Sequence, residues 1–135
     1  MVGDVFMRRA LRATAVMNLG GAVLFAFPDS VGRIAGLPAP VPHLYSLFIA
    51  FMVALFGVTY AWLARQPRID RPLVAFAAIG KSGFFAVTFV CWAAGEVSLR
   101  RAIGAGADLA FAAIFAAWLL SAPAAHGAAF DSRAA

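Results

Sequence analysis

The chain has 135 residues, of which 64% are apolar and 13% charged, and its mean hydropathy is +0.88. Ordinary soluble domains carry about 25% charged residues, so these values exclude that class and indicate an integral membrane protein. The net charge of +5 does not indicate a nucleic-acid partner, because the arginines lie beside apolar segments. We expect a single integral membrane domain over residues 1–135, with the lipid bilayer as its first partner.

Four apolar runs follow one another along the chain, at residues 10–27, 43–64, 72–94 and 101–120. Each has about the 20 residues that a helix needs to cross roughly 30 Å of hydrocarbon. The runs are continuous and do not alternate, which favours helices over a β-barrel. The first run is the weakest, because Asn18, Gly20 and Gly21 dilute it. The sequence therefore predicts an all-α fold, an up-down-up-down bundle of four transmembrane helices.

The connections between these runs differ in length and chemistry. Residues 28–42 contain four prolines and predict a stiff connector, in which Asp29 or Ser30 caps one short turn that ends near Gly36. Residues 65–71 and 95–100 form short connections, which predict antiparallel neighbouring helices. The alanine-rich tail, residues 121–135, is expected to fray.

Arginines beside the runs predict the orientation in the membrane. Six of them flank one side, at positions 8, 9, 12, 65, 68 and 71, and three flank the other, at positions 33, 100 and 101. The positive-inside rule then predicts an inner-membrane protein with both termini in the cytoplasm. Trp62 and Trp118 would mark the cytoplasmic interface and Trp92 the outer one.

Two ionisable residues lie inside apolar runs. Lys81, the only lysine, lies within residues 73–94, and Asp108 lies within residues 103–120. A charge at a helix centre costs about 2.5 to 3.5 kcal/mol on insertion scales, so each needs a physical reason. Counted from the predicted cytoplasmic helix ends, the depths of Asn18, Lys81 and Asp108 differ by about 6 Å, a distance that a lysine side chain spans. A polar cluster of these three residues is therefore expected.

Three interpretations of this cluster remain open. Lys81 and Asp108 neutralise each other and set the packing register, or they form a site for a ligand headgroup or a proton, or Lys81 lies along a lipid-facing groove and never meets Asp108. Small residues on the helices are expected to let the backbones approach within one bundle. These are Gly20, Gly21, Gly57, Gly80, Gly83, Gly104, Ala105 and Ala112.

Other chemistry has little support in the sequence. A single cysteine, Cys91, excludes an intramolecular disulfide and a CxxC redox mechanism. His43 and His126 fall on opposite sides of the predicted membrane and cannot share a metal ion or a haem. Glu96 is expected to form a solvated pair with the neighbouring arginines at positions 100 and 101. We therefore expect no catalytic residue, no metal site and no cofactor.

Residues 18–120 resemble a group of small, largely uncharacterised four-helix bacterial membrane proteins and, more distantly, DoxX-like four-helix proteins. The matching segments are Asn18-x-x-Gly21, Phe27-Pro28, Gly36-Leu37-Pro38, Gly57-Val58-x-Tyr60, Ala64-Arg65-x-Pro67, Gly80-Lys81 and the acid Asp108. The group often has Asn before that acid and tryptophans after it, whereas this chain has Ala107, Leu109 and Ala110. The resemblance implies a four-helix membrane fold and assigns no function.

Three classes of function follow from these residues. The first is a non-catalytic binding or accessory subunit built around Asn18, Lys81 and Asp108, which assembles with a membrane protein partner or with further copies of itself. The second is an accessory of membrane redox chemistry that holds a quinone or another lipophilic small molecule, with Lys81 donating to a carbonyl oxygen. The third is proton or ion movement, which the lack of a polar path above and below the charges disfavours.

Overall fold

The structure, a computed structural model, describes residues 3–121, and within this range it contains helices and no strand. The all-α prediction is therefore confirmed, while the predicted tail lies, apart from residue 121, outside the described residues. The first helix begins before its apolar run, with Gly3 as the residue preceding it. The helices are α1 (Asp4–Ala26), the short π-helix η1 (Pro28–Gly32), α2 (His43–Leu63), α3 (Arg71–Ala93) and α4 (Leu99–Ser121).

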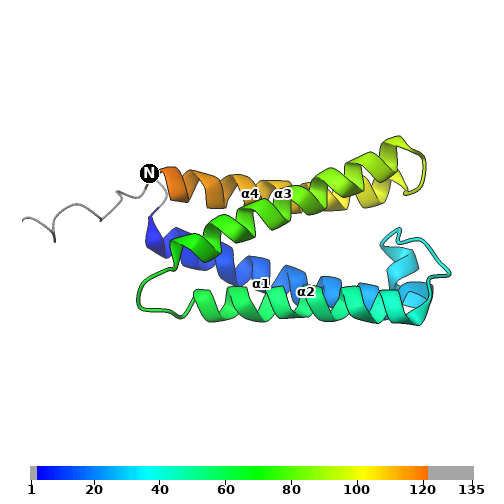
Figure 1. The fold of residues 1–135 in the computed structure, drawn as a ribbon, viewed down its shortest axis with the longest axis horizontal. Helices are drawn as coiled ribbons and strands as arrows, with labels where there is room; N and C mark the ends of the chain where they lie inside the picture. The colour runs from blue at the N-terminus through cyan, green and yellow to red at the C-terminus, as the bar shows by residue number, and fades with distance from the viewer. Residues whose placement is uncertain (1–2, 122–135) are drawn as a thin grey trace, which may run out of the picture.

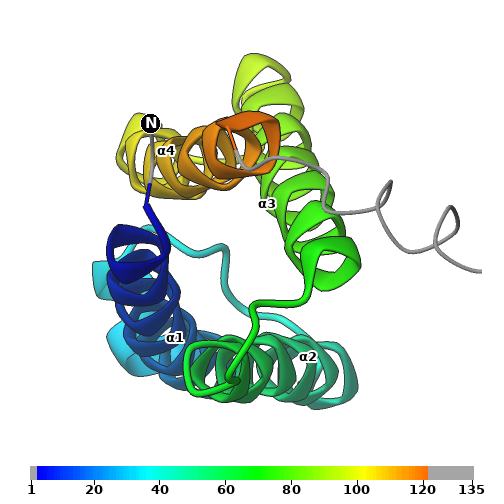
Figure 2. The same ribbon diagram turned by 90° about the vertical axis from the view of Figure 1, so that its left-hand side faces the viewer.

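Successive long helices run in opposite directions and form two hairpins (Figure 1). Helix α1 packs along α2 and α3 packs along α4, whereas the contacts between the hairpins are fewer and lie chiefly between α1 and α4. The end of the molecule where α1 begins and α4 ends is called the terminal end here. The opposite end, which holds the α1–α2 and α3–α4 connections, is called the two-loop end. Viewed from the terminal end, the four helices surround a common axis (Figure 2).

The hydrophobic core lies in the half of the bundle nearest the terminal end. Its fully buried side chains come from all four helices: Met7, Leu11 and Thr14 of α1, Leu63 of α2, Val74 of α3 and Phe115 of α4. Aromatic rings join the hairpins there, with Tyr60 and Phe115 separated by 6.1 Å between centroids and Phe56 and Phe76 by 5.9 Å. This half therefore holds the two hairpins together.

Polar contacts close the terminal end. The guanidinium of Arg8 donates to the carbonyl oxygens of Ala64, Gln66 and Pro67 at 3.0, 2.6 and 3.0 Å, and so satisfies backbone groups that the end of α2 leaves free. Trp118 is 3% exposed, and its indole N–H donates to Asp4 at 3.0 Å. The prediction that Trp118 marks a lipid interface is therefore wrong, because α1 covers it.

The glycines play two different roles. A Cβ added at Gly57 would lie 3.1 Å from the Leu19 side chain and 3.3 Å from the Ala15 carbonyl, so this glycine permits the close approach of α1 and α2. An added Cβ at Gly20, Gly80, Gly83 or Gly104 would meet nothing within 4 Å. The expectation that all of these glycines serve helix contacts is wrong for the second set, which faces open space.

Helices α2, α3 and α4 are each long and apolar enough to cross a membrane. Large apolar side chains on these helices lie outward and exposed, among them Phe51, Val58, Ile79, Val87 and Ile103. Soluble proteins rarely expose so continuous an apolar surface, and a lipid environment accounts for it. Helix α1 is not among these three, and three arginines occupy its first half. The structure therefore supports a membrane-spanning protein.

At the two-loop end, the connection after α1 packs against the connection between α3 and α4. Gly36 has a φ of +78°, which favours glycine, and an added Cβ would lie 2.6 Å from the Ser98 hydroxyl. Arg100 donates to the Ile34 carbonyl at 2.8 Å. A helical turn does end near Gly36, as predicted. The predicted cap at Asp29 or Ser30 is wrong, because η1 begins at Pro28, Phe27 occupies the cap position and no side chain caps the helix.

Candidate binding site

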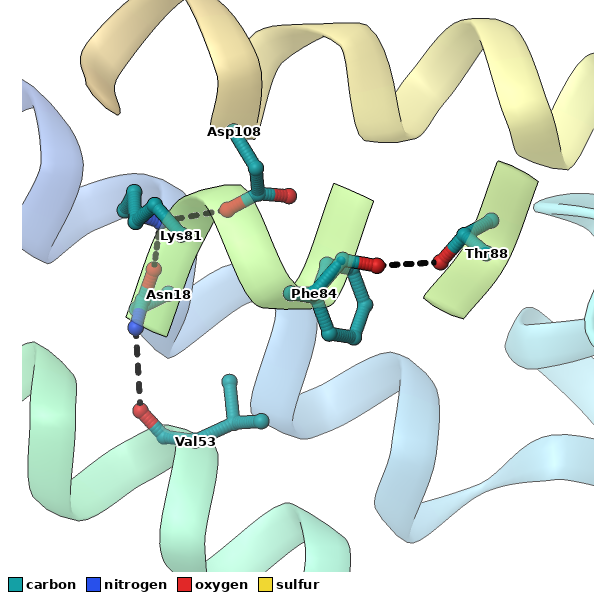
Figure 3. Close-up of polar contacts among 6 residues, drawn as sticks. All are labelled: Asn18, Val53, Lys81, Phe84, Thr88 and Asp108. Carbon is teal, nitrogen blue, oxygen red and sulfur yellow. Dashed lines mark hydrogen bonds and ion pairs between the residues drawn. The ribbon is translucent and has the colours of Figure 1, made fainter. Parts of the chain in front are cut away.

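One chain of hydrogen bonds links all four long helices (Figure 3). The Asn18 amide nitrogen on α1 donates to the Val53 carbonyl of α2 at 3.4 Å, and the Asn18 oxygen accepts from Lys81 Nζ of α3 at 3.0 Å. Lys81 Nζ also donates to Asp108 Oδ1 of α4 at 2.5 Å. Because an ammonium can only donate, the amide oxygen must face Lys81 and the amide nitrogen must face the carbonyl. The structure thus brings together the three polar residues singled out in the sequence.

The surroundings of Lys81 explain how a charge is held at this depth. The side chain is 4% exposed, and it lies over the rings of Tyr60 and Phe111, at 5.6 and 6.0 Å from their centroids. A carboxylate, an amide oxygen and aromatic faces all stabilise an ammonium. The interpretation in which Lys81 lies along a lipid-facing groove, away from Asp108, therefore disagrees with the structure. This is the one ion pair found within residues 3–121.

Helix periodicity places these side chains on inward faces. Asp108 lies one turn from Gly104 and from Ala112, and Ala112 is buried. On α1, Asn18 lies one turn from the buried Thr14. Thr88, one heptad after Lys81, does not join the cluster, because its hydroxyl donates to the Phe84 carbonyl of its own helix.

A cavity of about 630 Å³ lies beside the cluster, between the two hairpins. Asn18, Lys81 and Asp108 contribute to its wall, and most of the remaining wall is apolar, with side chains from α1, α2 and α3. It extends from Tyr60, at the edge of the core, to Arg100 and Arg101 near the two-loop end. Its size falls within the range of about 300–1,000 Å³ that is typical of small-molecule sites.

Glycines leave this space open. Gly20, Gly80 and Gly104, from three different helices, line the cavity, and an added Cβ at any of them would meet no atom within 4 Å. Larger side chains at these positions would extend into the cavity or along its rim. The sequence motif Gly80-Lys81 thus combines a position that leaves space with the residue that supplies the charge.

The cluster retains capacity for one more polar partner. Lys81 has three N–H donors, and two of them are used within the cluster. Asp108 is 14% exposed and uses only Oδ1, so Oδ2 has no hydrogen-bond partner within residues 3–121. A group that both accepts and donates, such as a hydroxyl, an amide or a hydrated carbonyl, matches this pair of free positions.

Two wall residues lie outside the cluster that the sequence predicts. Tyr60 is 3% exposed and lies against Lys81. Arg101, which begins the fourth apolar run and which the sequence marks only as a flanking charge, belongs to α4 and lies one heptad before Asp108, on the same face. The heptad spacing was visible in the sequence and would have identified Arg101. The contact of Tyr60 required the tertiary packing.

The weaker candidates do not join this site. Cys91 and His43 are absent from the cavity wall, and His126 lies outside the described residues. Glu96 does not pair with the neighbouring arginines, since Arg100 instead binds the Ile34 carbonyl, so the expected solvated pair is wrong. Among residues 3–121, no group of three His, Cys, Asp or Glu side chains is placed to hold a metal ion.

Comparisons with known proteins add no family to these observations. No family model matches the chain, no curated protein matches it, and no solved structure matches it. The case for function therefore depends on the geometry of the cavity and the polar cluster.

Proposed function

We propose that this protein binds a lipophilic small molecule in the cavity between its hairpins, with the polar group of that molecule at the cluster of Asn18, Lys81 and Asp108. It acts as a non-catalytic binding or accessory subunit of the membrane. The observation that carries the proposal is a mostly apolar cavity of about 630 Å³ whose wall includes a buried ion pair with unused donor and acceptor positions. Such a combination of apolar volume and a few convergent polar groups is typical of ligand sites.

The rival interpretation is that the ion pair only sets the helix packing. A pair with that role alone belongs in a packed region, yet the core lies toward the terminal end while the pair borders open volume. Asn18 is also unnecessary for balancing two opposite charges. Both features support a binding role.

A quinone accessory is one form of the same proposal, since Lys81 would donate to a quinone carbonyl. Proton movement has less support. The wall toward the terminal end is the apolar core, in which Met7, Leu11 and Phe115 are fully buried, so residues 3–121 offer a proton at Asp108 no continuous polar route in that direction. Binding therefore accounts for more of the observed features than transport does.

The membrane arrangement belongs to the same proposal. All four long helices cross the inner membrane, because α1 packs along the length of α2 and its arginines lie toward one end, where long side chains reach the headgroup region. The terminal end, with the larger number of arginines, then faces the cytoplasm, and both chain termini with it. A membrane protein partner, or a second copy of the chain, would receive or supply the bound molecule.

A cavity-filling variant tests the proposal. Gly104→Leu places a large side chain at the cavity wall, whereas Gly106→Leu adds the same side chain on the same helix at a position that does not line the cavity. The neutral probe is dodecan-1-ol, which has an apolar chain and a hydroxyl group. We expect it to raise the detergent melting temperature of the parent and of Gly106→Leu in a concentration-dependent way, and not that of Gly104→Leu.

A second variant examines the polar cluster. The double substitution Lys81→Met, Asp108→Leu replaces the buried ion pair with two apolar side chains. The hydroxyl of the probe then has no polar partner at these positions, so the probe should stabilise the variant less than the parent. Equal stabilisation of the parent and Gly104→Leu would show that the probe does not occupy the cavity, and the proposed function would then be abandoned.

A further inference from the structure

Arg101 lies at the end of the cavity opposite the core, near the two-loop end. Its guanidinium lies between two aromatic rings, 5.4 Å from the centroid of Phe25 on α1 and 5.1 Å from that of Phe84 on α3. Within residues 3–121 this guanidinium forms no hydrogen bond and no ion pair. The ring faces stabilise the cation, and its N–H donors have no acceptor among residues 3–121.

The charges along the cavity wall do not balance. Lys81 and Asp108 neutralise each other, and Asp108 lies one heptad from Arg101, about 10 Å along the helix axis. Aromatic faces attract a cation but carry no net charge, so they do not neutralise Arg101. Arg100, whose guanidinium donates to the Ile34 carbonyl, adds a second positive charge at the same end. The wall as a whole is therefore positive.

From this imbalance we infer that the ligand is an acidic amphiphile, whose carboxylate or phosphate headgroup binds Arg101 and whose chain extends into the cavity. The polar group that the proposed function places at Lys81 and Asp108 is then a second, uncharged group on that chain. The inference rests on the proposed function and adds the class and orientation of the ligand. A planar guanidinium matches both headgroups, because its parallel N–H groups meet two oxygens at once. The faces of Phe25 and Phe84 stabilise the guanidinium at this end of the cavity.

The placement of Arg101 along the fold fits this orientation. It lies in the first turn of α4, so a headgroup there is near the end of a membrane-spanning helix, where an anion remains close to water. The polar cluster lies about 10 Å deeper along α4 and would meet a hydroxyl or carbonyl carried on the chain at that distance from the acid. Such a group would use the free positions of Lys81 and Asp108.

Matched probes with one chain length test the inference. Dodecanoate and dodecyl phosphate carry the two anionic headgroups, dodecan-1-ol is the neutral comparison, and acetate and inorganic phosphate report headgroup binding without a chain. We expect both anionic amphiphiles to bind the parent about ten-fold more tightly than the alcohol, because one charge-assisted hydrogen bond to Arg101 changes the affinity by about that factor. Apparent affinities come from the dependence of melting temperature on probe concentration in a nonionic detergent.

Two variants isolate the arginine. Arg101→Gln should bind both anions no better than the alcohol and should keep its affinity for the alcohol. Arg33→Gln removes one positive charge from an exposed site outside the cavity at the same end, and it should behave as the parent does. Because each probe partitions into the micelles equally for every variant, comparisons between variants are free of that effect.

The possible results separate the two proposals. Equal affinity of the parent for acid and alcohol, both lost in Gly104→Leu, would overturn the acidic-ligand inference and leave the proposed function standing. An acid preference that persists in Arg101→Gln would also overturn the inference. Binding of acetate or inorganic phosphate as tight as that of the amphiphiles would mean an anion site without a lipophilic ligand. Failure of every probe to distinguish the parent from Gly104→Leu would remove the proposed function itself.

Discussion

Removing one member of the Lys81–Asp108 pair should destabilise the protein more than removing both. Lys81 is 4% exposed and Asp108 14%, and breaking a pair of this kind costs about 3 to 5 kcal/mol. For Asp108→Leu we expect about 3 kcal/mol, since the ammonium keeps its contacts with Asn18 and two ring faces. For Lys81→Met we expect about 2 kcal/mol, because the remaining carboxylate is less buried than the ammonium, with 14% of its side chain exposed at the cavity wall.

The double variant Lys81→Met, Asp108→Leu removes both charges, and apolar replacement of a buried pair is often neutral. It leaves the Asn18 oxygen without its donor, so we expect a loss of about 1 to 2 kcal/mol from one unsatisfied acceptor. The single losses sum to about 5 kcal/mol, which leaves a coupling energy of about 3 to 4 kcal/mol. Adding Asn18→Leu to the double variant should recover most of the remaining loss.

Reversible unfolding in mixed micelles, titrated with a denaturing detergent, measures these four free energies. Thr88→Val serves as the control, because the Thr88 hydroxyl bonds only within its own helix and should show no coupling to Lys81. Additivity of the two single losses within about 0.5 kcal/mol would mean that the charges do not interact, and would refute the geometry of the cluster.

Further predictions concern orientation and packing. Reporter fusions after residues 40, 68, 97 and 130 should report the periplasm at 40 and 97 and the cytoplasm at 68 and 130, and a periplasm-only reporter active at 68 would contradict the arginine-based topology. Gly57→Val should lower the free energy of unfolding by about 1 to 3 kcal/mol, because even a Cβ would lie 3.1 Å from Leu19, and the same change at Gly83, which faces open space, should have much less effect. The melting temperatures of Gly57→Val and Gly83→Val test this expectation. Equal losses of stability in the two variants would rule out close packing of α1 on α2.

The sequence alone determined the class of the protein. Apolar composition and run length predict helices, because a membrane requires each segment to satisfy its own backbone groups, and the described residues are helical. Equal depth along antiparallel helices was enough to group Asn18, Lys81 and Asp108, since helical rise is constant at about 1.5 Å per residue. These properties depend on local periodicity, which a sequence displays directly.

Only the tertiary structure decided where the cavity lies. Glycines at positions 20, 80 and 104 are expected from sequence to bring helices together, yet they face a cavity, whereas Gly57 makes a close contact. The difference arises because the core fills one half of the bundle and leaves the hairpins apart in the other, and that depends on side chains distant in sequence. The same cause puts Arg101 between Phe25 and Phe84 and covers Trp118 with α1. Helical periodicity assigns a residue to a face, but only the packing of the two hairpins decides whether that face meets a neighbouring helix, lipid or an open cavity.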